Sequence, residues 1–136
     1  MRVWGSGAAP LPDEVAASFH RRFGVVVHQG YGLTEAAPIV TTTAVDDRDP
    51  RAGSIGPPLP GVEVRLVDAD GTDVLAGDPG EVWVRGPNVF PGYWHDQEAT
   101  ARVLTDDGWL RTGDVAVVEG DELRLVDRAK ELIIVS

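Results

Sequence analysis

Glycine and proline recur so often along this chain that only short helices and strands fit between them. Sixteen glycines and ten prolines occur in 136 residues, and both residue types favour turns and end regular elements. The hydrophobic pattern between the turns changes partway along the chain. The sequence therefore predicts two regions of different architecture, which meet near Asp46.

The first region has the pattern of a strand, a helix and a second strand. A short apolar stretch runs into the turn "GSGAAP", and a helix is predicted for "LPDEVAASFHRRFG", where Val15, Phe19 and Phe23 share a face. Gly24 is expected to cap this helix. The run "VVVHQ" then indicates a buried strand of a parallel sheet. Residues 1–45 are therefore expected to be a piece of a larger α/β layer.

The second region is predicted to be mostly antiparallel β. It follows the proline- and glycine-rich stretch "AVDDRDPRAGSIGPPLPG", which indicates a loop or linker. "VEVRLVD" and "GEVWVRG" alternate apolar and polar residues, "HDQEATARVL" is typical of a short helix, and "DVAVVEGDELRLVD" of a hairpin. We expect residues 46–127 to form a small, barrel-like antiparallel subdomain. Residues 128–136, "RAKELIIVS", are expected to form a hinge and the start of a further domain.

Composition excludes several classes of function. Twelve basic against 22 acidic residues give a net charge of −10, which argues against nucleic-acid binding and against docking on anionic lipid. The chain has no cysteine and three scattered histidines, so neither a thiolate nucleophile nor a zinc site is expected. Neither a run of 18 apolar residues nor a signal peptide is evident, so we expect no transmembrane segment and a cytoplasmic location.

The stretch "GYGLTE" places several ligand-binding groups at the end of a predicted strand. Gly30 and Gly32 allow close approach of the backbone to a ligand, and Tyr31 offers a flat ring for a base. The hydroxyl of Thr34 suits a phosphate oxygen, and the carboxylate of Glu35 suits Mg²⁺. The alternative is purely structural, with Thr34 as a helix N-cap and Glu35 at the positive end of the helix dipole.

Three other segments are candidates of the same kind. "GSGAAP" lacks the lysine and hydroxyl residue of a Walker motif, so it is either a flat wall for a purine or a tight turn. In "GWLRTGDV", Asp114 is expected in a turn just before a strand, where it either accepts ribose hydroxyls or only shapes the turn. In "VDRAKELII", Arg128 either reaches a ribose or phosphate or belongs to a surface charge cluster.

The order of these motifs resembles that of the adenylate-forming (AMP-binding) superfamily, and most of all fatty-acyl-CoA synthetases. "SGAAP", "GYGLTE", "GEVWVRGPNVFPGYW", "WLRTGD" and "DRAKELI" follow one another over essentially the whole chain. The resemblance implies that ATP or AMP binds to nine residues: Gly7, Ala8, Ala9, Pro10, Gly30, Tyr31, Gly32, Asp114 and Arg128. It implies catalytic roles for Thr34 at the α-phosphate and for Glu35 as the Mg²⁺ ligand, stacking of Tyr31 on adenine, ribose binding by Asp114, and a hinge at Lys130.

The implied function is that of an acyl-CoA ligase. Such an enzyme activates a fatty or other carboxylic acid with ATP as acyl-AMP and then transfers the acyl group to CoA. The resemblance places this chain in the C-terminal third of the large domain, up to the hinge, with the rest of the ligase as its partner. The family's lysine-containing phosphate loop and the lid lysine do not occur here, so the 136-residue chain is expected to be inactive alone.

Two alternatives stay open. The first is an amino-acid adenylation domain of a peptide synthetase, which "DRAKELI" argues against. The second is a truncated, non-catalytic binding module that keeps the β fold.

Overall fold

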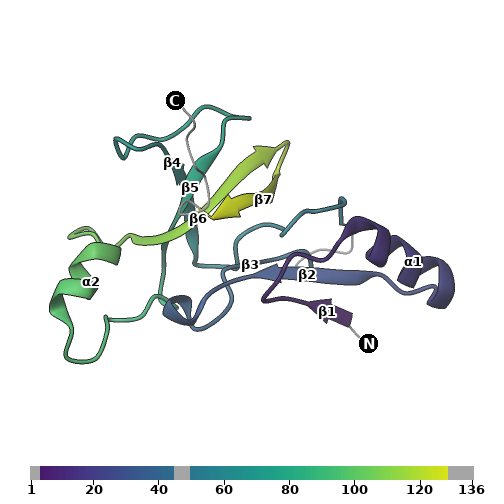
Figure 1. The fold of residues 1–136 in the computed structure, drawn as a ribbon, viewed down its shortest axis with the longest axis horizontal. Helices are drawn as coiled ribbons and strands as arrows, with labels where there is room; N and C mark the ends of the chain where they lie inside the picture. Colours follow the sequence, from purple (N-terminus) through teal and green to yellow (C-terminus); the bar gives the residue numbers. More distant parts are fainter. Residues whose placement is uncertain (1–3, 45–49, 129–136) are drawn as a thin grey trace.

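The computed structural model describes residues 4–44 and 50–128 and contains two sheets (Figure 1). A three-stranded sheet has the order β1-β2-β3, and a four-stranded antiparallel sheet has the order β4-β5-β6-β7. The elements are β1 (Trp4–Ser6), α1 (Asp13–Phe23), β2 (Val27–Tyr31), η1 (Thr34–Ala36), β3 (Thr41–Thr42), β4 (Glu63–Val67), β5 (Gly80–Arg85), α2 (Gln97–Val103), β6 (Leu110–Glu119) and β7 (Glu122–Arg128). The predicted fold class is confirmed: an α/β piece precedes a curled antiparallel sheet.

The α/β piece contains the predicted strand, helix and second strand, but β2 is mostly half-buried and not fully buried, and it pairs antiparallel with β3 on its other edge. β1 pairs with β2 in parallel, and α1 connects them. Acidic residues in the first turn and basic residues in the last turn suit the dipole of α1. Gly24 ends the helix with φ of 64°, and its N–H donates to the carbonyl of His20 at 2.7 Å, so the predicted cap is confirmed.

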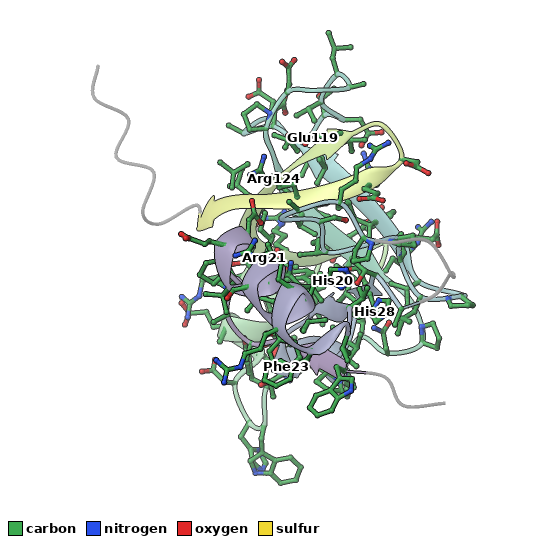
Figure 2. All side chains as sticks on the ribbon, turned by 90° about the vertical axis from the view of Figure 1, so that its right-hand side faces the viewer. His20, Arg21, Phe23, His28, Glu119 and Arg124 are labelled. Atoms are coloured by element: carbon green, nitrogen blue, oxygen red, sulfur yellow. The ribbon has the colours of Figure 1, made fainter. Side chains whose placement is uncertain are left out.

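One side of α1 carries aromatic rings. The ring of Phe19 lies 5.9 Å from that of Trp4 and 4.7 Å from that of Phe23. Phe23 itself is 57% exposed, and Figure 2, which faces α1, shows Phe23 and Arg21 on different sides of the helix. The predicted apolar face therefore exists, but in the described residues it is only partly covered.

The antiparallel sheet is built on the predicted alternation. Val82 and Val84 of β5 are buried at 1% and 0% exposure, while Glu81, Trp83 and Arg85 alternate with them on the opposite face of the sheet. There Arg85 donates two hydrogen bonds to the carboxylate of Glu63 on β4, at 3.0 and 2.9 Å. α2 begins after Asp96, whose side chain accepts the N–H of Ala99 at 2.8 Å. Figure 1 places α1 and α2 at opposite ends of the molecule.

The proline- and glycine-rich stretch connects the two sheets tightly instead of separating them. On one side the N–H of Thr42 donates to the carbonyl of Pro57 at 3.1 Å. On the other side the N–H of Ile55 donates to the carbonyl of Leu123 on β7 at 2.8 Å. The prediction of a loop or linker was therefore incomplete, because backbone groups of this stretch form hydrogen bonds with strands of both sheets.

Both sheets contribute to a single hydrophobic cluster. Its buried members are Tyr31, Ala36, Val40, Ile55, Leu66, Val82, Val84, Leu110, Ala116 and Leu123. The predicted subdomain boundary after residue 45 lies outside the described residues, and the division into 1–45, 46–127 and 128–136 stays a prediction. Within the described part of the chain, neither helix has the length and apolar character needed to cross a bilayer.

Candidate functional site

Two of the predicted loops leave the three-stranded sheet at the same edge. The register of β1 and β2 pairs Ser6, the last residue of β1, with Gln29, two residues before β2 ends at Tyr31. A Cβ added to Gly7 would lie 3.5 Å from the carbonyl oxygen of Gly30. The segment Gly7 to Pro10 is exposed, and parallel strands with such loops at their carboxyl ends form the usual ligand site of an α/β sheet.

The loop after β2 is folded too tightly for any residue but glycine at position 32. A Cβ on Gly32 would overlap the carbonyl oxygen of Pro38. Asn88 holds the far side of the loop, since its Nδ2 donates to the carbonyls of Ala36 and Ile39 at 3.0 Å each. The loop thus has a defined shape. Gly32 is required for the close approach of the loop backbone to Pro38, whereas close approach to a ligand stays a prediction.

Thr34 does not cap a helix. It is the first residue of the short 3₁₀ helix η1, the N-cap is Leu33 in an extended conformation, and no side chain caps the helix. The predicted N-cap role of Thr34 is therefore wrong, because Thr34 is already the first residue of η1, whereas Glu35 does lie in its first turn. Thr34 is exposed, and its hydroxyl makes no hydrogen bond to any of the residues that the structure describes.

Glu35 is held from both its backbone and its side chain. Its carbonyl accepts the N–H of Phe90 at 2.8 Å, and its Oε1 accepts the hydroxyl of Tyr93 at 2.7 Å. This hydrogen bond is the main cause that raises the pKa of Tyr93 above its usual value, with burial and the charge of Glu35 adding to it. Tyr93 was missed as a site residue, although its segment "NVFPGYW" stood out as a motif.

Asp114 receives the hydroxyl of Tyr31. The hydroxyl donates to Oδ2 of Asp114 at 2.8 Å, and the two residues are 83 positions apart in the chain. Tyr31 is only 6% exposed, so little of its ring is open to a base, and the stacking role stays a prediction. The two predicted site residues are nevertheless in direct contact.

The local structure around Asp114 differs from the expectation. β6 runs from Leu110 to Glu119, so Asp114 lies inside a strand, and the predicted turn before the strand is wrong. Gly113 has φ of 74°, and the register with β7 shifts between Val115 and Ala116. The strand continues through this kink because β5 pairs with Arg111 before it and with Val115 after it, and β7 pairs from Asp114 onward, which local turn signals do not reveal.

The remaining predicted positions are only partly described. Arg128 is the backbone partner of Asp114 across β6 and β7, which places it beside the site, whereas its side chain is outside the described structure. Lys130, the predicted hinge, lies outside the described residues altogether.

The chemistry of the site suits a single hard cation bound with a phosphate. Among the described residues, no group of three or more His, Cys, Asp or Glu side chains is arranged to hold a metal ion. Mg²⁺ in phosphate sites commonly uses one or two protein carboxylates and fills its other positions with phosphate and water. Glu35 fits that pattern, since it is half-buried and its Oε2 has no hydrogen bond to a described residue.

A separate open hollow lies next to α2. Its volume is about 1070 Å³, and its lining includes Tyr93, Trp94, Thr100 and Arg111. None of the residues predicted to bind a nucleotide lines it, but Tyr93 connects it to Glu35.

Comparison with known proteins gives consistent results. Residues 1–94 match the family described as AMP-binding enzyme. A long-chain-fatty-acid–CoA ligase of Yersinia pestis is 47% identical over all of this chain and 24% of its own length. Long chain acyl-CoA synthetase 7, peroxisomal, of Arabidopsis thaliana is 40% identical over 97% of this chain and 19% of its own length. The ATP-bound crystal structure of MatB from Rhodopseudomonas palustris has a TM-score of 0.91 at 36% identity, over 98% of this chain and 27% of that one.

The chain spans about a quarter of the length of the bacterial relatives it matches.

Proposed function

The chain belongs to the AMP-binding enzyme family, and from this premise we propose that it forms part of an ATP-dependent acyl-CoA ligase. The names of the similar curated proteins support a fatty acid as the substrate to be activated. Two contacts between predicted site segments support the proposal: a Cβ on Gly7 would lie 3.5 Å from the carbonyl oxygen of Gly30, and the hydroxyl of Tyr31 donates to Asp114 at 2.8 Å. We propose that the loop from Gly7 to Pro10, the loop from Gly32 to Glu35 and Asp114 together bind the nucleotide.

In this proposal the nucleotide lies at the carboxyl ends of β1 and β2. The exposed small residues from Gly7 to Pro10 form a wall for the adenine, and Tyr31 contributes the small exposed part of its ring. The carboxylate of Asp114 accepts the ribose hydroxyls while the hydroxyl of Tyr31 holds it from the other side. A carboxylate that is already oriented loses less conformational entropy when the ribose binds.

The first chemical step is the formation of an acyl-adenylate. A carboxylate oxygen of the acid attacks the α-phosphorus, the bond between that phosphorus and the bridging oxygen breaks, and pyrophosphate leaves. Thr34 would donate its hydroxyl to an α-phosphate oxygen, and Glu35 would hold an Mg²⁺ ion, which would supply positive charge to offset that of the phosphates. No covalent intermediate on the protein is required, in keeping with the absence of cysteine.

The second step forms the thioester. The sulfur of CoA, after loss of its proton, attacks the acyl carbon, and AMP leaves with the bridging oxygen. None of the described residues is assigned to this step, and the predicted hinge at Lys130 and the cytoplasmic location stay predictions.

A full-length ligase carrying this segment provides the test. We expect exchange of radiolabelled pyrophosphate into ATP that depends on a carboxylic acid, followed by a thioester of that acid and CoA, detected by mass spectrometry. Exchange without any thioester would indicate an adenylating enzyme that passes the acyl group to another acceptor. Absence of exchange with a panel of short, long and aromatic acids would refute the proposal.

A further inference from the structure

Tyr93 is fixed in place by three independent contacts. Its ring packs edge-on against Phe90, with centroids 4.9 Å apart at an interplanar angle of 78°. Its backbone N–H donates to the hydroxyl of Thr100 in α2 at 2.9 Å. Its own hydroxyl donates to Oε1 of Glu35 at 2.7 Å, across 58 positions of sequence. These contacts therefore fix the hydroxyl of Tyr93 beside the carboxylate of Glu35.

The segment that carries Tyr93 also holds the backbone of Glu35. The N–H of Phe90 donates to the carbonyl of Glu35 at 2.8 Å. Glu35 is thus bound by two residues of one loop, one through the main chain and one through the side chain. A glutamate has three rotatable side-chain bonds, and fixing both ends of the residue leaves the carboxylate little freedom.

The hydrogen-bond partner of the Glu35 carboxylate is the uncharged hydroxyl of Tyr93. No Lys or Arg of the described chain forms an ion pair with Glu35, whereas Glu63 pairs with Arg85 on the outer face of the sheet. A cation would neutralise the carboxylate and compete with a metal ion. A hydroxyl donor orients the group and leaves its charge and its Oε2 available.

We propose that Tyr93 is a positioning residue that holds the carboxylate of Glu35 in the orientation needed to bind a divalent cation together with the nucleotide phosphates. This inference rests on the proposed function, because it assigns the cation to Glu35. Asp114 is held in the same manner by Tyr31, so each of the two tyrosines of the chain donates to one carboxylate of the site.

The test uses Tyr93→Phe in the full-length ligase that carries this segment. Phenylalanine keeps the ring against Phe90 and removes only the hydroxyl. We expect the dissociation constant of Mn²⁺, measured by electron paramagnetic resonance with a non-hydrolysable ATP analogue, to rise about tenfold, the lower end of what loss of a supporting partner costs a metal site. The Mg²⁺ concentration for half-maximal pyrophosphate exchange should rise in parallel, while the melting temperature changes little.

Two further variants sharpen the result. Trp94→Phe alters the neighbouring residue, which is 88% exposed and whose ring packs against that of His95, and it should leave the Mn²⁺ affinity unchanged. In a Glu35→Gln background, Tyr93→Phe should cause no further loss of Mn²⁺ affinity, because both changes act on one interaction.

The outcomes separate this inference from the function on which it rests. If the unmodified ligase exchanges pyrophosphate but Tyr93→Phe binds Mn²⁺ normally, Tyr93 has only a structural role and the inference is overturned. Additive losses from Tyr93→Phe and Glu35→Gln would overturn it as well. If the unmodified ligase neither exchanges pyrophosphate nor binds Mn²⁺ with the analogue, the proposed function fails and the inference fails with it.

Discussion

Two carboxylates of the site each accept a hydrogen bond from a tyrosine hydroxyl. Tyr93 donates to Glu35 and Tyr31 donates to Asp114, at 2.7 and 2.8 Å. Hydrogen bonds to a charged acceptor are stronger than those between neutral groups, yet a neutral donor leaves the negative charge in place. Single substitutions at these positions should therefore distinguish the effect of the carboxylate's orientation, the effect of its charge and the effect on the stability of the fold.

Glu35→Gln tests the charge of the site. Glutamine can still accept the hydroxyl of Tyr93, so the loop should keep its shape, but the hard anionic ligand is lost. We expect adenylation to lose about 2–4 kcal/mol of transition-state stabilisation, comparable to removal of one preorganised electrostatic group. Acid-dependent pyrophosphate exchange measures this loss. Normal exchange by the variant would show that Glu35 serves only the local structure.

Asp114→Ala and Tyr31→Phe form a matched pair. Each removes the same hydrogen bond, which for a charged acceptor contributes roughly 1.5–3 kcal/mol to stability, so both should lower the melting temperature. Only Asp114→Ala removes the proposed ribose ligand. We expect the preference for ATP over 2′-deoxy-ATP, taken from the two Michaelis constants, to narrow in Asp114→Ala and to persist in Tyr31→Phe. An unchanged preference in Asp114→Ala would leave Asp114 with a structural role alone.

At the scale of elements, the site depends on irregular backbone held between regular strands. The loop after β2 turns back so closely that Gly32 meets the carbonyl of Pro38. β6 bends at Gly113 and yet pairs with β5 before and after the bend, and with β7 from Asp114 onward. Such kinks re-aim a side chain without ending the strand, and here the kink directs Asp114 toward Tyr31.

Gly32→Ala should disrupt the loop after β2. The added methyl group overlaps backbone atoms, which cannot move aside as a flexible side chain can, so we expect a loss of about 1–3 kcal/mol or more. Gly5→Ala is the matched control, since a Cβ there comes no closer than 4.0 Å to the carbonyl oxygen of His28. Chemical unfolding of both variants measures the difference. Equal stability of the two would contradict the close approach at Gly32.

At the scale of the whole molecule, the two sheets act as one unit. Buried residues of both belong to one cluster, and the stretch through Ile55 and Pro57 donates and accepts hydrogen bonds on either side. Asp114 on one sheet and Tyr31 on the other are thereby held at hydrogen-bond distance. The geometry of the site is a property of the packed pair of sheets and of neither sheet alone.

The 136-residue chain by itself should not catalyse thioester formation. Its net charge of −10 disfavours binding of a triphosphate, and the lysine-containing phosphate loop and the lid lysine that the family resemblance implies do not occur in it. We expect no sustained formation of acyl-CoA from ATP, CoA and fatty acid, assayed beside the full-length ligase at equal concentration. Sustained thioester formation by the chain would contradict this expectation.

The sequence by itself determined the elements whose signals are local. The α1 helix with its cap at Gly24, the alternation that buries Val82 and Val84, and the hairpin between β6 and β7 all follow from periodicity and turn chemistry within a few residues. The order of the motifs also indicated the loops at Gly7 and Thr34, because the candidate ligand-binding residues of each loop are adjacent in the sequence.

Only the tertiary structure decided how distant groups meet. Nothing in the local pattern places Tyr93 on Glu35 or Tyr31 on Asp114, since those pairs are 58 and 83 residues apart and depend on how the two sheets pack. The same reason explains the error at Asp114, where strand pairing on both sides overrides a turn signal. Local propensities set the elements of this chain, whereas the supporting hydrogen bonds of its site arise only once both sheets share one core.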